Sequence, residues 1–133
     1  MKITLILVGK TSSADIKSIC SDYNKRINHY VKFEEVVIEN SAVKVTDPNK
    51  AKEKEGELIL KKIIPGDFVI LLDDKGKEYD SVQFATYLGG LFNHSLKNIC
   101  FVVGGAYGFS ETLRAVVITT MLYVIAIVIK DVL

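Results

Sequence analysis

Residues 67–73 (DFVILLD) place five consecutive apolar side chains between two acidic ones, and this run constrains the fold more than any other part of the chain. Successive side chains of a strand point to opposite faces of the sheet, so a strand without a polar face must be covered on both sides. Residues 3–8 and 98–103 are similarly apolar, and residues 31–39 (VKFEEVVIE) are rich in β-branched and aromatic residues. We therefore predict four strands in a buried, mostly parallel sheet.

Segments with helical periodicity separate these strands. Ser12 or Ser13 can cap the first helix, and its apolar positions predict one buried stripe, formed by Ile16, Cys20, Tyr23, Ile27 and Tyr30. Residues 40–50 are polar and contain a proline, which favours a loop, and residues 51–64 then predict the second helix. Ser81 can cap the third helix, for which we predict burial of Val82, Ala85, Leu88 and Phe92.

Strands that alternate with helices predict an α/β fold, with a mostly parallel sheet, helices on both of its faces and right-handed crossovers. The 133 residues fit a single domain. A net charge of +1 excludes a protein that coats nucleic acid through bulk charge, so any RNA binding needs a local patch. Cys20 and Cys100 belong to no CxxC or Cys/His cluster, which predicts reduced core thiols and fits a cytoplasmic protein.

Two apolar runs have to be considered as candidates for a signal peptide or a membrane-spanning helix. The first nine residues lack the length and cleavage site of a signal peptide, so we expect a buried strand there. Residues 115–129 are almost entirely apolar but fall short of the roughly 20 residues that a membrane-spanning helix needs. We therefore expect no membrane association, and keep insertion of this tail as a further hypothesis.

Ligands of parallel sheets bind beyond the carboxyl ends of the strands, which here means residues 73–76 and 104–108. Gly104, Gly105 and Gly108 would allow a ligand to approach the backbone closely, although this spacing matches neither a dinucleotide fingerprint nor a phosphate loop. Spacing alone favours a structural strand-to-helix turn. Adjacent Asp73 and Asp74 would point in opposite directions, which favours a solvated strand end over a carboxylate pair.

The remaining polar residues favour ordinary structural roles. His29 and His94 have no Asp or Cys at ligand spacing, so we predict no metal site. In residues 52–57 (KEKEGE) glutamates interleave with lysines, which is typical of a solvated helix and weighs against an RNA-binding face.

Five strings occur in an order that is more specific than any one of them. They are MKITLILVGK at 1–10, DYNKRINHY at 22–30, KEKEGELIL at 52–60, LLDDKGK at 71–77 and FVVGGAYGFSE at 101–111. Together they resemble the RlmH family over about residues 1–111. The resemblance implies a SPOUT (α/β-knot) fold and a homodimer in the cytoplasm. It also implies S-adenosylmethionine-dependent methylation of N3 of a pseudouridine in 23S ribosomal RNA, on the assembled ribosome.

The resemblance also implies which residues meet the cofactor. Leu72 matches the family position whose backbone contacts S-adenosylmethionine, and Gly104 matches the first glycine of the family's cofactor turn, which Gly105 and Gly108 would shape. It identifies no catalytic residue, and methyl transfer from a sulfonium requires no metal.

After Glu111 the family motifs end, and residues 112–133 form an atypical apolar tail. The family continues with a threaded loop that supplies the knot, a third cofactor-contacting stretch and much of the dimer contact. Its absence leaves two alternatives: an active methyltransferase, or an inactive remnant that retains only dimerisation or weak cofactor binding. A reading-frame error in the gene is one hypothesis for the tail, and the two other frames of the coding DNA would test it.

Overall fold

Four parallel strands form the central sheet of the protein. The computed structural model describes residues 1–9, 13–39, 46–73, 76–105, 107–120 and 127–129, with the backbone alone at 116–120 and 127–129. The strand order is β2-β1-β5-β3, and every neighbouring pair is parallel. The strands are β1 (Lys2–Val8), β2 (Lys32–Ile38), β3 (Phe68–Leu72) and β5 (Asn98–Val103). The four predicted strands are confirmed, to within one residue at each end.

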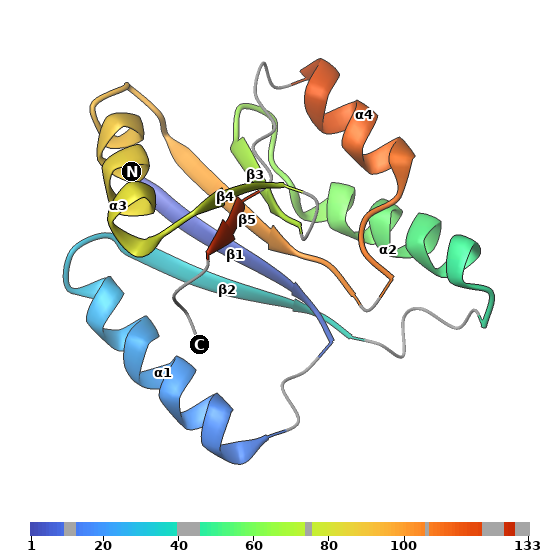
Figure 1. Ribbon diagram of the computed structural model, residues 1–133, viewed down its shortest axis with the longest axis horizontal. Coiled ribbons are helices and arrows are strands. Elements are labelled where there is room, and N and C mark those ends of the chain that lie inside the picture. Colours follow the sequence, from blue (N-terminus) through green and yellow to red (C-terminus); the bar gives the residue numbers. More distant parts are fainter. Residues whose placement is uncertain (10–12, 40–45, 74–75, 106, 121–126, 130–133) are drawn as a thin grey trace.

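Helices cover both faces of this sheet, because parallel neighbours need long crossover connections. The helices are α1 (Ala14–Asn28), α2 (Pro48–Lys62), α3 (Ser81–Phe92) and α4 (Glu111–Thr120). Helices α1 and α3 lie on one side of the sheet, and α2 and α4 lie on the other (Figure 1). The predicted α/β class is therefore confirmed.

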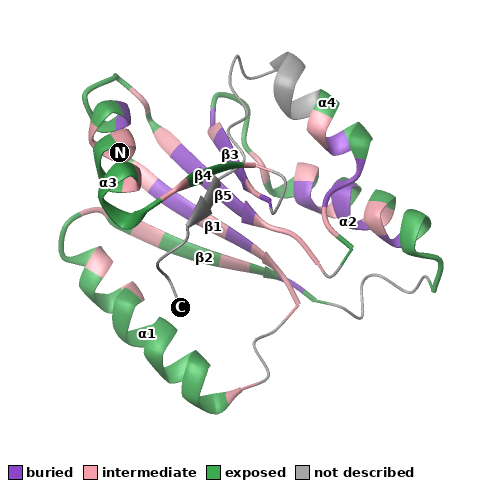
Figure 2. Ribbon diagram, viewed as in Figure 1, coloured by how far each residue is buried: buried purple, intermediate pink, exposed green. Residues whose placement is uncertain are grey.

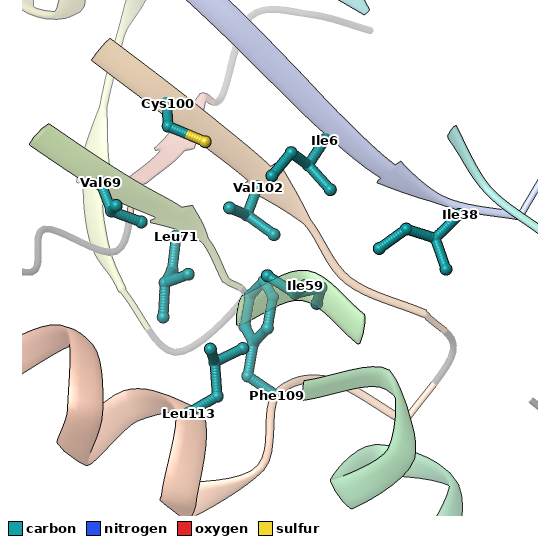
Figure 3. Close-up of a cluster of buried hydrophobic side chains, with 9 residues drawn as sticks. All are labelled: Ile6, Ile38, Ile59, Val69, Leu71, Cys100, Val102, Phe109 and Leu113. Atoms are coloured by element: carbon teal, nitrogen blue, oxygen red, sulfur yellow. The ribbon is translucent and has the colours of Figure 1, made fainter. Parts of the chain in front are cut away.

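Two hydrophobic clusters lie on opposite faces of the sheet, and the strands are buried between the helices that supply them (Figure 2). On β3, Val69 and Leu71 belong to the cluster under α2 and α4, whereas Ile70 belongs to the cluster under α3. This alternation is why the run at 67–73 has no polar face. The first cluster comprises Ile6, Ile38, Ile59, Val69, Leu71, Cys100, Val102, Phe109 and Leu113 (Figure 3).

The predicted buried stripe of α1 is wrong. No residue of this helix is buried; Ile16 and Tyr23 are 54% and 55% exposed, and Tyr30, beyond the helix, is 90% exposed. The helix lies beside β2, which is an edge strand, so the core under the sheet centre does not reach it. Both cysteines are free, but only Cys100 is a core thiol, since Cys20 on α1 is exposed.

The predicted buried stripe of α3 is right only at Leu88, which packs against the core, whereas Val82, Ala85 and Phe92 are exposed. Val82 is 76% exposed and Phe92 44% exposed. The side chains packed against the core follow helical spacing from a different starting point: Phe84, Tyr87, Leu88 and Leu91. Two of these side chains make aromatic contacts: the Phe84 ring lies edge-on to Phe101 of β5, and the Tyr87 ring stacks on Tyr79.

Local hydrogen bonds determine where the helices begin. Ser13 caps α1 as predicted, accepting from the Ile16 amide at 3.4 Å. The cap of α3 is Asp80 and not Ser81, because Asp80 accepts from the Gln83 amide at 2.7 Å while the Gln83 side chain accepts from the Asp80 amide. Pro48 lies in a predicted loop but opens α2, where its fixed φ and missing N–H suit the first helical turn.

The atypical tail supplies all of α4 except its first residue, and a short strand, β6 (Ile127–Ile129), which pairs in parallel with β4 (Lys77–Tyr79). β4 was not predicted, because three residues directly after a turn give no periodic signal. Among the described residues, no helix has both the length and the apolar character needed to cross a membrane.

Candidate functional site

The ends of β3 and β5 bring the two expected ligand regions together. Leu72, the last residue of β3, pairs with Val103, the last residue of β5, and Gly104 follows directly. Leu72 and Gly104 therefore lie beside each other at the carboxyl edge of the sheet, although 32 positions separate them in sequence. Asp74 and Lys75, which belong to the expected ligand region, lie outside the described residues.

The glycine turn is built on glycine-specific geometry. Gly108 has φ of +80°, which side-chain-bearing residues rarely adopt, and its amide donates to the Gly105 carbonyl at 3.1 Å. A Cβ at Gly104 would lie 3.0 Å from the Phe109 ring, so the backbone there lies directly on that ring. A Cβ at Gly108 would meet nothing within 4 Å, so the space beside this end of the turn is open.

Phe109 anchors the turn in the core. It is 5% exposed, and with Leu113 it reaches into the cluster that also holds Ile59 and Leu71 (Figure 3). Neither residue was singled out from the sequence. The signal available was an apolar residue directly after a glycine turn, which also occurs in turns without a ligand.

Glu55 is the residue that the sequence interpretation missed most clearly. It was assigned to a solvated helix face, but it is 8% exposed and its carboxylate lies against Gly105, whose backbone amide donates to it. Burial raises the pKa of the Glu55 carboxyl, and the hydrogen bond from Gly105 partly offsets this shift. A signal did exist, because Ala51, Glu55 and Ile59 follow one another at intervals of four residues, and all three are buried.

Helix α4 begins against α2. Ser110 is 3% exposed, and its hydroxyl oxygen accepts from the Leu113 amide at 3.1 Å, so the predicted helix opening at Ser110 and Glu111 is confirmed. A Cβ at Gly56 would lie 2.9 Å from this hydroxyl oxygen, so a larger residue there would displace the Ser110 hydroxyl.

An open groove of about 500 Å³ runs along α2 and the start of α4. Three lysines and three glutamates contribute to its lining, so their charges balance: Lys50, Lys52, Lys54, Glu53, Glu57 and Glu111. Lys54 pairs with Glu57 at 3.8 Å, and Glu53 accepts from Thr112 at 3.3 Å. These exposed positions match the solvated helix face expected from the alternation of charges.

Asp73 does not form the solvated strand end that was predicted. It is 6% exposed, and its carboxylate forms an ion pair with Arg114 of α4. The prediction failed because α4, which carries Arg114, 41 positions after Asp73, folds back over the end of β3. Arg114 thus fastens the atypical tail to the same edge of the sheet that carries Leu72.

The two histidines lie apart from this edge. His29 caps the carboxyl end of α1 and His94 follows α3, and both are exposed. Within the described part of the chain, His, Cys, Asp and Glu form no group of three that could hold a metal ion.

Comparison with known proteins identifies the family to which the chain is similar. A family model described as "Predicted SPOUT methyltransferase" matches residues 1–122, past residue 111 where the recognisable motifs end. A protein of Parabacteroides distasonis is 49% identical over 112 residues, which are 84% of this chain and 71% of the relative. Relatives from Flavobacterium psychrophilum and Christiangramia forsetii are 45% and 43% identical over 112 residues, with the same coverage of each chain, 84% and 71%. All three are named ribosomal RNA large subunit methyltransferase H.

Proposed function

This chain belongs to the SPOUT methyltransferase family, and we propose that it transfers the methyl group of S-adenosylmethionine to N3 of a pseudouridine in 23S ribosomal RNA. The names of its relatives support a large-subunit ribosomal RNA substrate. The pseudouridine target, the assembled ribosome as the form of the substrate and the cytoplasmic location follow from the resemblance to the RlmH family.

The single observation that carries the proposal is the meeting of Leu72 and Gly104 at one edge of the sheet. The resemblance assigns cofactor contacts to both residues, and the fold places them beside each other. The turn fits a ligand held by backbone groups, since Gly104 is backed by the Phe109 ring and open space lies beside Gly108. We propose that four residues form the S-adenosylmethionine site: the backbone of Leu72 and Gly104 contacts the cofactor, and Gly105 and Gly108 shape the turn around it.

The reaction needs alignment more than covalent chemistry from the protein. The cofactor would supply an electrophilic methyl group on sulfur. The chain's part is to hold the pseudouridine N3 in line with that methyl group and to favour loss of the N3 proton. We assign no catalytic residue and no metal to this step.

A second candidate function is an inactive remnant that retains dimerisation or weak cofactor binding. The sequence after residue 111 favours it, since the family's threaded loop and its third cofactor-contacting stretch are not found there. A protein that lacks one of the three contacting stretches makes fewer interactions with the cofactor, while the entropic cost of immobilising the cofactor remains.

The exposed face of α1 supports a homodimer. Ile16, Ile19 and Tyr23 lie at helical spacing on one stripe and are 54%, 57% and 55% exposed. A second copy of the chain that covered this stripe would remove apolar surface from water. Sedimentation of the protein beside Ile19→Glu tests this, with a dimer that dissociates in the variant as the expected result.

The function is tested by calorimetric titration of S-adenosylmethionine into the purified protein, Gly104→Val and Gly89→Ala. Gly89 is a matched control, because a Cβ there meets nothing within 4 Å. Binding by the protein and by Gly89→Ala, but not by Gly104→Val, supports the site. Methylation of ribosomes deficient in the modification, mapped by mass spectrometry, then identifies the nucleotide. A protein that binds no S-adenosylmethionine contradicts the first function and favours the remnant.

A further inference from the structure

Glu55 is a buried carboxylate on an otherwise solvated stretch of helix. Its neighbours Glu53 and Glu57 are exposed, whereas Glu55 lies on the buried side of α2 with Ala51 and Ile59. Carboxylates are seldom buried without a partner, because the charged form loses its hydration. A carboxylate at this position is therefore expected to have a hydrogen-bond donor beside it, and that donor is a backbone amide.

That partner is the glycine turn. A Cβ at Gly105 would lie 3.0 Å from the carboxyl carbon of Glu55, so the side chain occupies the space that any other residue would fill. The Gly105 amide donates to the carboxylate, and the Gly105 carbonyl accepts from the Gly108 amide at 3.1 Å. Both backbone hydrogen-bonding groups of Gly105 are thus engaged.

Helix α2 holds the turn at both of its ends. Glu55 contacts Gly105 where the turn begins, and the next residue, Gly56, lies against Ser110 where the turn ends. The four residues between these contacts include Gly108, whose positive φ completes the turn.

We propose that Glu55 is a positioning residue that fixes the glycine turn through the Gly105 amide and thereby sets the geometry of the adjacent Gly104 backbone. Glu55 acts through Gly105 and does not itself touch the cofactor. The identity of the ligand, S-adenosylmethionine, rests on the proposed function. A turn that is already ordered has less freedom to lose when a ligand binds, so the hydrogen bond strengthens binding without adding a contact.

The test separates positioning from ordinary stability. The variants are Glu55→Ala, Glu55→Gln, which keeps an acceptor oxygen at the same place, and Glu55→Asp, which withdraws the carboxylate by one methylene. Glu57→Ala is the control for charge, since Glu57 is exposed on the same helix. Ile59→Val is the control for stability, since Ile59 is 1% exposed one turn further along.

Two measurements are made on each protein well below its unfolding temperature: deuterium exchange of the Gly105 amide, and the Kd for S-adenosylmethionine. A hydrogen bond to a charged acceptor typically changes an equilibrium tenfold or more. We expect about tenfold faster exchange and about tenfold weaker binding in Glu55→Ala and Glu55→Asp. Glu55→Gln should restore most of both, and the two controls should change neither.

The outcomes distinguish this inference from the proposed function. Unchanged Gly105 exchange in folded Glu55→Ala overturns the inference whether or not the cofactor binds. Faster exchange with unchanged cofactor affinity overturns the link from the turn to binding. Failure of the unmodified protein to bind S-adenosylmethionine counts against the proposed function, and amide exchange then decides whether Glu55 fixes the turn. If Glu55→Ala does not fold, the comparison of Glu55→Asp with Glu55→Gln decides the same question.

Discussion

Leu113→Ala tests whether the atypical tail is part of the domain. Leu113 is the third residue of α4, beyond the point where the family motifs end, yet it is 1% exposed in the cluster with Ile59 and Phe109. If residues 1–133 form one domain, as we propose, removing this side chain must destabilise the whole fold. If the tail is an appendage, it will not.

The expected magnitude follows from the burial of Leu113. Truncation of a fully buried leucine costs about 2–5 kcal/mol, through lost transfer free energy and the cavity left behind. Leu113 lies in one cluster with Ile59 of α2 and the Phe109 ring, so we expect a loss within this range, about 3 kcal/mol. For a chain of this size that corresponds to a fall in Tm of roughly 10 °C.

Urea unfolding followed by far-ultraviolet circular dichroism measures the loss directly, since the chain has no tryptophan to report by fluorescence. Val82→Ala is the matched control, because it truncates an apolar helix residue that is 76% exposed, and it should change the free energy of unfolding by less than about 0.5 kcal/mol. A loss below about 1 kcal/mol in Leu113→Ala would refute the reasoning, because α4 would then not be packed in the core.

Three further predictions concern buried charge and thiols. Arg114→Ala should lower the free energy of unfolding by about 1–3 kcal/mol in urea titrations, since it removes the ion pair to the buried Asp73 carboxylate. Because Arg114 is only half-buried, we expect a loss below that of a fully buried pair. Burial raises the pKa of Glu55 above its ordinary value of 4.5, so the folded state holds this proton more tightly than the unfolded state does. The free energy of unfolding should therefore fall, relative to that of Glu55→Gln, as the pH rises above 4.5. A difference between the two proteins that does not change with pH would contradict the assignment. Iodoacetamide should alkylate exposed Cys20 in the folded protein but Cys100 only in denaturant, because burial raises the pKa of Cys100 to about 12; peptide mass mapping reads both sites.

The alternation of strand and helix could be read from the chain because it depends on local pattern. A strand that is apolar on both faces has to be sandwiched, and the run at 67–73 has this pattern. The glycines likewise predicted the turn at 104–108, since the low cost of the positive φ observed at Gly108 is a property of glycine itself. The meeting of Leu72 with Gly104 was not read from the chain, because a parallel sheet brings the strand ends to one edge but only the strand order makes β3 and β5 neighbours.

Burial of individual side chains could not be read in this way. Periodicity finds a stripe on a helix but not what covers it, so Tyr23 was expected inside and is exposed, while Val82 was expected to be buried and is not. Asp73 was misjudged for the same reason, because its arginine partner comes from a distant segment.

Residue order by itself therefore determined the α/β class, the parallel sheet and the position of the glycine turn, because each depends on patterns of a few neighbouring residues. Only the tertiary structure decided that Glu55 faces inward onto Gly105 and that Arg114 closes over Asp73. These pairings join residues 50 and 41 positions apart, and their energies depend on which segments lie against each other in the folded chain.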